Sequence, residues 1–263
     1  MINAAVTGAS GRMGKLLIEN IIQMDGIQLS AAFDLANIGK DVGEVAQLGK
    51  LDVPISDVAD MATVLKESKT DVVIDFTIAA ATVVNAPMVA DAGVDLVIGT
   101  TGFSPEQRSI IEDAITRNNV TGIISPNYSM GVNVFFKILQ ETAKYLSDYD
   151  IEVIEAHHNQ KKDAPSGTAM RAAEVISETL GGKDFVYGRE GLAPRAKEIG
   201  IHAVRGGDIV GDHTVLFAGG SERIEIKHQA HSRNAFASGA VKSAIWIANA
   251  EPGIYTMDDI LGF

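Results

Sequence analysis

The chain has 263 residues, of which 46% are hydrophobic and 21% are charged, and its formal net charge is −12. Such a chain can bury one large core or two smaller ones. The negative charge argues against nucleic acid and anionic membranes as main partners, because both would be repelled over much of the surface. The sequence contains no cysteine, which excludes disulfides, thiolate catalysis and cysteine-ligated metal sites. It shows no recognisable targeting segment and no apolar run of membrane-spanning length, so we expect a cytoplasmic location.

Apolar runs rich in β-branched residues alternate with helical patterns through the first half of the chain. That alternation predicts parallel strands covered on both faces by helices, as in a Rossmann-like doubly wound α/β sheet. Ser104, Pro105 and Gln107 supply an N-cap, a proline suited to the first helical position and the glutamine of a capping box. The strands are expected at 2–7, 27–33, 72–76, 96–99 and 121–125, and the helices at 12–24, 58–66, 82–92 and 105–118.

Beyond residue 128 the pattern changes, because several strand-like runs follow one another with few helices between them. Consecutive strands favour a mostly antiparallel or mixed sheet, and hence a second, α+β domain. The helical pattern at 237–248 could return to the first domain. We therefore expect one domain at 1–127 completed by 237–263, and another at 128–236. The second domain should contain helices at 132–146 and 169–180 and strands at 151–156, 198–205, 213–218 and 223–228.

A glycine-rich turn follows the first predicted strand and opens a helix. Its residues are Gly8, Ala9, Ser10, Gly11, Arg12, Met13 and Gly14, with the spacing G-x-x-G-x-x-G. Glycines at such a turn let backbone N–H groups approach a pyrophosphate at the positive helix terminus. The spacing departs from G-x-G-x-x-G, since Ser10 stands where the second glycine is usual, and a glycine-rich turn without a ligand is the alternative.

Asp34 strengthens the dinucleotide interpretation of this turn. It ends the second predicted strand 20 positions after Gly14, where a carboxylate can accept hydrogen bonds from an adenosine ribose. A solvated acid at a strand end is the alternative. Its charge would repel the 2′-phosphate of NADPH, and the adjacent Leu35 offers no compensating cation. We therefore predict a preference for NADH, with NADPH tolerated.

Two further segments lie at predicted strand ends, where loops of a parallel sheet line the ligand crevice. Both are plausible walls of a nicotinamide site, although ordinary turn chemistry explains their glycine, proline and asparagine equally well. The segments are Gly99, Thr100, Thr101 and Gly102, and Ser125, Pro126, Asn127 and Tyr128.

The stretch EAHHNQKKDAPSGTA, residues 155–169, lies between a predicted strand and a predicted helix. Ser166 or a close neighbour should cap the helix and present the N–H groups of Gly167 and Thr168 to a carboxylate. The protonatable donors of this predicted anion site are His157, His158, Lys161 and Lys162.

A polar, solvated loop is the alternative for this stretch, and for Lys162 and Asn159 we favour it. A metal site is the weaker interpretation, because adjacent histidines on an extended chain point to opposite sides and no nearby residues complete a ligand set. We expect no metal.

The stretch resembles the signature E-x-H-H-x-x-K-x-D-x-P-S-G-T-A of the 4-hydroxy-tetrahydrodipicolinate reductase family. The segments VTGASGRMG, VVIDFT, VIGTTGF and PNYSMGVN are similar to other family segments in the same order, so the resemblance covers essentially the whole chain. It implies an NAD(P)H-dependent oxidoreductase of lysine and diaminopimelate biosynthesis that acts on a small dicarboxylate. It also implies a nucleotide-binding domain and a substrate domain whose open sheet builds a homotetramer, with the C-terminal segment returning to the first domain.

The resemblance also implies roles for individual residues. His157 becomes a proton donor and acceptor, Lys161 a second proton donor, and His158, Gly167 and Thr168 the carboxylate-binding residues. Family members that bind the 2′-phosphate often carry arginine after the acidic residue, where this chain has Leu35, which puts NADPH use in doubt. Another amino-acid-pathway dehydrogenase and a non-catalytic dinucleotide-sensing module are the alternatives. The cofactor-binding residues implied are Gly8 to Met13, Asp34, Gly99, Thr100, Thr101, Ser125, Pro126, Asn127 and Tyr128.

Overall fold

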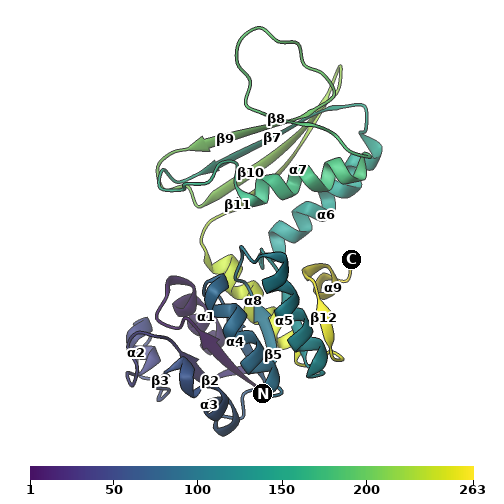
Figure 1. Cartoon of the computed structure of the whole chain (residues 1–263). Coiled ribbons are helices and arrows are strands. Elements are labelled where there is room, and N and C mark those ends of the chain that lie inside the picture. Colours follow the sequence, from purple (N-terminus) through teal and green to yellow (C-terminus); the bar gives the residue numbers. More distant parts are fainter. The chain divides into compact units, whose positions relative to one another are not determined.

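The computed structural model describes residues 1–263, which form two compact units. The first unit comprises Met1–Met130 and Asn234–Phe263, and the second comprises Gly131–Arg233. Figure 1 shows how the yellow C-terminal segment belongs with the purple and blue N-terminal elements. None of the helices is long and apolar enough to cross a membrane.

The first unit contains a seven-stranded sheet in the order β12-β6-β5-β4-β1-β2-β3, with every neighbouring pair parallel. Its apolar strands are buried on both sides, as helix-covered parallel strands are. The order reverses beside β1, so the loops after β1 and β4 flank the switch point where such sheets bind ligands. The strands are β1 (Ile2–Thr7), β2 (Ile27–Phe33), β3 (Ile55–Ser56), β4 (Val72–Asp75), β5 (Asp95–Ile98), β6 (Thr121–Ile124) and β12 (Gly253–Tyr255).

Helices pack on both faces of this sheet. On one face, Leu17 and Ile21 of α1 join Val241 and Ala244 of α8 in a fully buried cluster. On the other face, α3, α4 and α5 contribute a second cluster that includes Leu65. The helices of this unit are α1 (Arg12–Gln23), α2 (Val42–Ala46), the 3₁₀ turn η1 (Val58–Asp60), α3 (Met61–Glu67), α4 (Ala79–Asp91), α5 (Pro105–Arg117), α8 (Asn234–Ile247) and α9 (Met257–Leu261).

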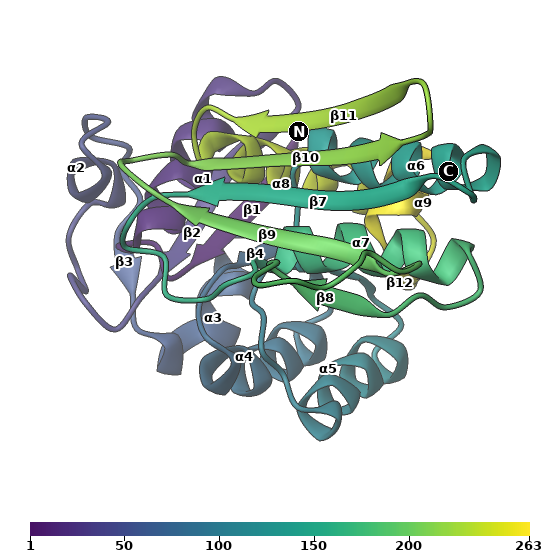
Figure 2. The same ribbon diagram turned by 90° about the horizontal axis from the view of Figure 1, so that it is seen from above.

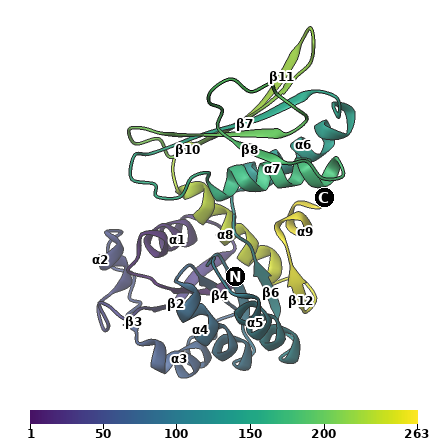
Figure 3. The same cartoon turned by 45° about the horizontal axis from the view of Figure 1, so that its top comes forward.

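The second unit contains a mixed five-stranded sheet in the order β11-β10-β7-β9-β8. Strand β7 lies between antiparallel β10 and parallel β9 (Figure 2). Helices α6 and α7 lie along one face of the sheet (Figure 3), where Phe135, Leu139 and Ile176 pack against Val153 and Val215. The elements are α6 (Met130–Tyr145), β7 (Asp150–His157), α7 (Gly167–Thr179), β8 (Phe185–Tyr187), β9 (Ile199–Arg205), β10 (Gly211–Ala218) and β11 (Arg223–Ala230).

Alternation along β7 gives the two faces of this sheet different chemistry. Val153, Glu155 and His157 are buried on the helix-covered side, whereas Ile154 on the opposite side is 40% exposed. Val204 of β9 is likewise exposed. The open face therefore presents apolar side chains that no helix of the unit covers.

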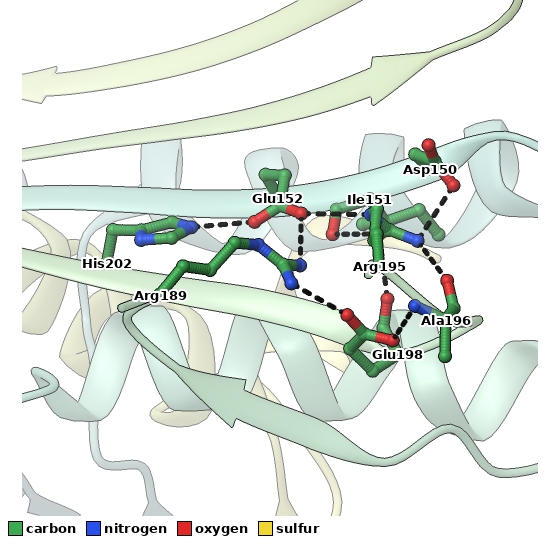
Figure 4. A network of polar contacts seen from close by, with 8 residues as sticks. All are labelled: Asp150, Ile151, Glu152, Arg189, Arg195, Ala196, Glu198 and His202. Atoms are coloured by element: carbon green, nitrogen blue, oxygen red, sulfur yellow. Dashed lines mark hydrogen bonds and ion pairs between the residues drawn. The ribbon is translucent and has the colours of Figure 1, made fainter. Parts of the chain in front are cut away.

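A polar network on the same open side fastens the segment before β9 to the sheet (Figure 4). Glu152 accepts hydrogen bonds from Arg189 Nη2 at 2.7 Å and Arg195 Nε at 3.1 Å, and it pairs with Nε2 of His202 at 2.6 Å. Burial alone would raise the pKa of Glu152, but these three partners hold it below its ordinary value. A Cβ on Gly200 would lie 1.8 Å from the Glu152 carboxylate, so the network requires glycine there.

The expected long elements are present, with ends that differ by a few residues. The capping box of Ser104 and Gln107 at the start of α5 is confirmed. Helix α4 begins at Ala79 rather than at 82, and α6 and α8 begin at Met130 and Asn234, where the two units meet along the chain. The sequence patterns did not indicate α2, β3, β8, β12 or α9, because two to five residues are too few to show a hydrophobic period.

Candidate functional site

The glycine-rich turn of the first unit brings the backbone of three residues together. Gly8 adopts a φ of +68°, and the N–H of Gly11 donates to the carbonyl of Gly8 at 2.9 Å. A Cβ on Gly14 would lie only 2.2 Å from that same carbonyl oxygen. No side chain caps the N-terminus of α1, whose N-cap is Gly11. The turn thus presents backbone rather than side chains at a positive helix terminus.

Asp34, directly after β2, holds this turn in place. One of its carboxylate oxygens accepts from the N–H of Ser10 at 2.9 Å, and the other accepts from the N–H of Ala36 at 3.0 Å. Each carboxylate oxygen can accept more than one hydrogen bond. The acid can therefore order the glycine turn and still receive ribose hydroxyls.

A cavity of about 410 Å³ near Asp34 is lined by Lys15, Asn37, Lys40, Glu44 and Val45. Lys40 donates to the side-chain oxygen of Asn37 at 3.1 Å, and the amide of Asn37 donates to Ser10 Oγ at 3.3 Å. Leu35 is 81% exposed. The immediate neighbour of Asp34 thus offers no cation, but two lysines line the adjoining cavity.

A second cavity of about 400 Å³ lies beyond the carboxyl ends of β5 and β6. Of the residues expected at the nicotinamide, Thr100, Thr101, Ser125 and Pro126 line it. Tyr128 is placed differently, because its side chain is only 1% exposed and its hydroxyl bonds to the carbonyls of Ile98 and Ile123. Burial raises the pKa of Tyr128, so the phenol stays protonated and serves as a structural donor.

At the end of β4 a buried carboxylate, Asp75, orders three threonine hydroxyls. Its Oδ1 accepts from Thr77 Oγ1 at 2.7 Å, Thr100 Oγ1 at 3.0 Å and Thr82 Oγ1 at 3.1 Å. Thr82 Oγ1 also lies 2.9 Å from Thr100 Oγ1, so the carboxylate and the three hydroxyls form one hydrogen-bonded cluster. Sequence reasoning assigned Asp75 no role, although its position at a strand end beside the switch point could have indicated one.

Together these features fit a dinucleotide. A Cβ on Gly14 would clash with the backbone of Gly8 and Ala9, so the close packing of the turn requires glycine there, and Asp34 lies at the position of a ribose-binding acid. Thr100 and Thr101 border a cavity at the other side of the switch point. The first unit thus has the glycine turn and the strand-end acid that are typical of dinucleotide-binding sheets of this class.

In the second unit, His157 lies at the carboxyl end of β7 and is 8% exposed. Its Nδ1 is 2.6 Å from Oε2 of Glu155, which is completely buried. Arg205 of β9 donates to both oxygens of Glu155 at 2.8 Å, and the N–H of Ser166 donates to Oε1 at 3.0 Å. Burial opposes the charge on Glu155, but Arg205, His157 and Ser166 outweigh it and hold the pKa of Glu155 below its ordinary value.

Ser166 is the N-cap of α7, as the sequence predicted, and accepts the N–H of Ala169 at 3.2 Å. Its hydroxyl also bonds to Nε2 of His213 on β10 at 3.1 Å. Burial, followed by the nearby His157, lowers the pKa of His213 to about 4, so this ring is neutral at physiological pH.

The first turn of α7 follows directly from this cap. Gly167 is its first residue, and a Cβ there would meet no atom within 4 Å. The glycine is therefore not demanded by the fold, and its bare backbone leaves space for a ligand beside Thr168.

The remaining predicted residues lie on the loop between β7 and α7. Lys161 forms an ion pair with Asp163 at 2.9 Å and keeps 21% of its side chain exposed. Arg205 also donates to the carbonyl of Asp163 at 2.6 Å, which ties this loop to β9. His158 is partly exposed, and Lys162 is exposed. His157, Lys161, Ser166 and the start of α7 thus belong to one continuous segment of the chain. Arg205 of β9 contacts this segment at Glu155 and at Asp163.

Sequence reasoning missed Arg205 and His213 and gave Glu155 no role. Residues two apart on a strand point to the same face, so the spacing of Glu155 and His157 was a usable signal. Arg205 and His213 belong to β9 and β10, which lie beside β7 because these strands pair with it in the sheet. No local pattern could indicate them.

Comparison with known proteins covers the whole chain. The sequence pattern described as dihydrodipicolinate reductase, N-terminus, matches residues 2–128, and the pattern described as dihydrodipicolinate reductase, C-terminus, matches residues 131–261. A protein of Methanococcoides burtonii named 4-hydroxy-tetrahydrodipicolinate reductase is 86% identical, with 100% of both chains covered. One of the same name from Methanosarcina mazei is 70% identical, also with 100% of both chains covered.

Solved structures show the same architecture. A dipicolinate-bound dihydrodipicolinate reductase from Paenisporosarcina sp. TG-14 is 27% identical and aligns with a TM-score of 0.80 over 97% of each chain. An amine dehydrogenase from Mycobacterium smegmatis is 16% identical and aligns with a TM-score of 0.60 over 98% of this chain and 95% of the other. The second likeness concerns the fold alone.

Proposed function

This chain belongs to the dihydrodipicolinate reductase family, and we propose that the site residues of its first and second units perform the reduction for which the family is named. The function is that of a 4-hydroxy-tetrahydrodipicolinate reductase, an NAD(P)H-dependent oxidoreductase of lysine and diaminopimelate biosynthesis. The reaction converts (2S,4S)-4-hydroxy-2,3,4,5-tetrahydrodipicolinate to tetrahydrodipicolinate. The observation that carries the residue assignments is the carboxylate-bound His157 beside the Ser166-capped start of α7. We propose that the protein acts in the cytoplasm, where the reduced cofactor is available.

The substrate is a dianion, and the second unit offers donors for its carboxylates. We assign them to the backbone of Gly167 and Thr168, with His158 as a side-chain donor. The Ser166 cap directs the positive end of α7 toward the same place. Orientation and charge pairing by such preorganised donors supply a large part of an enzyme's rate.

His157 and Lys161 are the proposed proton donors. Loss of the 4-hydroxyl group as water leaves a carbon–carbon double bond conjugated with the ring C=N bond. Hydride addition to the carbon end of this conjugated system places negative charge on the ring, and a proton must neutralise it to give tetrahydrodipicolinate. His157 is held by Glu155 through Nδ1, which leaves Nε2 for proton exchange. Lys161 pairs with Asp163 at 2.9 Å and is reachable from solvent.

The dinucleotide, when bound, supplies the hydride. Gly8 to Met13 and Asp34 are the proposed contacts for its pyrophosphate and adenosine, and Gly99 to Thr101 with Ser125 to Asn127 are those for its nicotinamide. Tyr128 contributes to this nicotinamide site through its backbone and by packing, since the centroid of its ring lies 5.5 Å from that of Phe76. No metal is needed for this chemistry.

NADH is the proposed preferred cofactor. The charge of Asp34 disfavours a 2′-phosphate, although Lys15 and Lys40 beside the cavity lessen that repulsion and permit NADPH. Leu35→Arg should raise the ratio of kcat/KM for NADPH to that for NADH by about tenfold, or ~1.4 kcal/mol. Leu35 is exposed, so the change should leave Tm unaltered. Initial rates with each cofactor check this, and equal rates of the unaltered protein with both would contradict the stated preference.

We also propose a homotetramer built through the open sheet face of the second unit. Exposed Ile154 and Val204 on that face support it, because contiguous apolar patches mark interfaces. Ile154→Arg should lower the mass measured by light scattering from four chains to fewer. Thr214→Arg would not serve as a control for this change, because Thr214 lies opposite Ile154 in the sheet and on the same face. Leu35→Arg in the first unit is the control, because it adds the same charge at an exposed apolar residue outside this sheet.

A coupled assay tests the reductase function directly. Substrate made enzymatically in place should cause oxidation of NADH at 340 nm only when the protein is present. Homoserine and aspartate, offered with NAD, should give no reduction of the cofactor. Turnover of either in place of the cyclic dicarboxylate would favour another amino-acid dehydrogenase, and dinucleotide binding with no turnover of any of them would favour a sensing module.

A further inference from the structure

Glu155 is the most completely enclosed charged side chain of the second unit, and two of its three hydrogen-bonding partners, Arg205 and the N–H of Ser166, can only donate. It is 0% exposed. Oε1 receives the N–H of Ser166 and Nη2 of Arg205, while Oε2 receives Nη1 of Arg205 and faces Nδ1 of His157. A buried carboxylate is costly unless it is paired and hydrogen-bonded, and here both conditions are met.

This arrangement decides which form Glu155 takes. A two-pronged bond from an arginine is among the strongest contacts a carboxylate makes, and the N–H of Ser166 can only donate. Arg205 contacts both oxygens, and its bonds together with those of His157 and Ser166 outweigh the effect of burial and hold the pKa of Glu155 below its ordinary value. Glu155 is therefore ionised, and all of its close partners must give it protons.

The same arrangement decides where His157 carries its proton. Since Glu155 only accepts, Nδ1 of His157 must donate across the 2.6 Å contact. Nε2 then carries the lone pair in the neutral ring and the exchangeable proton in the charged ring. Gly211 of β10 keeps the space beside this atom open, because a Cβ there would lie 3.1 Å from Nε2.

We propose that Glu155, anchored by Arg205, is a positioning residue that fixes the His157 proton on Nδ1 and so makes Nε2 the atom that exchanges protons with the substrate. This inference rests on the proposed role of His157. Glu155 acts only through that ring. His213, whose ring centroid lies 5.1 Å from that of His157, has its Nε2 bonded to Ser166 rather than to His157.

The variant Glu155→Gln separates the positioning role from mere filling of space. Its amide nitrogen must replace one of two oxygens, and each oxygen faces two donors. Only His157 can become an acceptor, so the glutamine N–H should turn toward it and move its proton to Nε2. A neutral histidine in the wrong tautomer cannot accept at the reacting atom.

We expect Glu155→Gln to lower kcat by about 10²- to 10⁴-fold, the range of general acid–base catalysis and of tautomer inversion in a hydrolase triad. KM and the Kd for NADH should stay within about threefold of the unaltered enzyme, because neither the proposed carboxylate donors nor the first unit is changed. Nitrogen-15 NMR of histidine-labelled full-length protein should show the neutral His157 protonated on Nδ1 in the unaltered enzyme and on Nε2 in the variant.

Glu152→Gln is the matched control. Glu152 lies on the same strand and also joins a histidine and arginines, but on the opposite face of the sheet (Figure 4). It should lower Tm by an amount comparable to Glu155→Gln and leave kcat within about threefold. Equal losses of kcat in both variants would mean that Glu155 matters only for folding.

Two results would overturn the proposal: near-normal kcat in Glu155→Gln, or an Nε2-protonated neutral His157 in the unaltered enzyme. The NMR measurement needs no variant, so it decides the matter even if Glu155→Gln fails to fold. Failure of the proposed function looks different. In that case His157→Gln would turn over normally, or the unaltered enzyme would not oxidise NADH with the substrate.

Discussion

Lys161→Ala should lower kcat by about 10²- to 10⁴-fold, the effect expected when a general acid is removed. The Kd for NADH should not change, because the proposed dinucleotide contacts all belong to the first unit. The fold should survive as well, since the partner of Lys161, Asp163, is a largely exposed acid and exposed ion pairs contribute little. Steady-state rates and fluorescence titration with NADH measure the two quantities.

Lys162→Ala is the control for this change. It removes the same charge from the neighbouring residue, which is exposed and has no proposed role. Lys161→Arg adds a further distinction, because arginine keeps the charge but cannot give up its proton. If Lys161→Arg is fully active, Lys161 binds the substrate without donating a proton; if Lys161→Ala is fully active, both assignments are wrong.

Gly14→Ala should strongly damage the first unit. The new Cβ would lie 2.2 Å from the carbonyl oxygen of Gly8 and 2.8 Å from Cα of Ala9, and backbone cannot move aside as a flexible side chain can. We expect a loss of roughly 3 kcal/mol, at the upper end of typical overpacking. That corresponds to a fall in Tm of roughly 6–12 °C for a chain of this size. The Kd for NADH should rise at least tenfold, because the turn must open.

Gly167→Ala provides the matched comparison, since it adds the same methyl group to the first turn of another helix. Its Cβ would meet open space, so Tm and the Kd for NADH should be unchanged. The proposed carboxylate site lies there instead, and KM for the substrate should rise. A similar fall of Tm in both variants would show that helix-start glycines, rather than the contact with Gly8, set the stability.

The overall charge of −12 does not conflict with an anionic substrate. Lys161 lies on the loop between β7 and α7, and the positive end of α7 follows on the same segment. Salt screens charges separated by more than about 10 Å, so local cations outweigh distant acids. The buried acid of this region, Glu155, is already neutralised by Arg205.

Hydrophobic pattern alone located the long elements of the fold. Strands β1 and β2 begin and end where their apolar runs do, and Ser104 and Ser166 cap the helices that they were expected to cap. These features depend on residues within a few positions of one another, and such local preferences are written in the sequence. Short elements such as β12 form only because β6 offers an edge to pair with.

The sequence by itself determined the types of site residue, the glycine turn, and the order of strands and helices along the chain. The tertiary structure decided how those residues are held. Arg205 reaches Glu155, and His213 reaches Ser166, across separations of 50 and 47 residues, because β9 and β10 flank β7 in the sheet. Strand register is set by packing of the whole sheet against α6 and α7, so the charge state of Glu155 and the proton position on His157 follow from the fold rather than from any local motif.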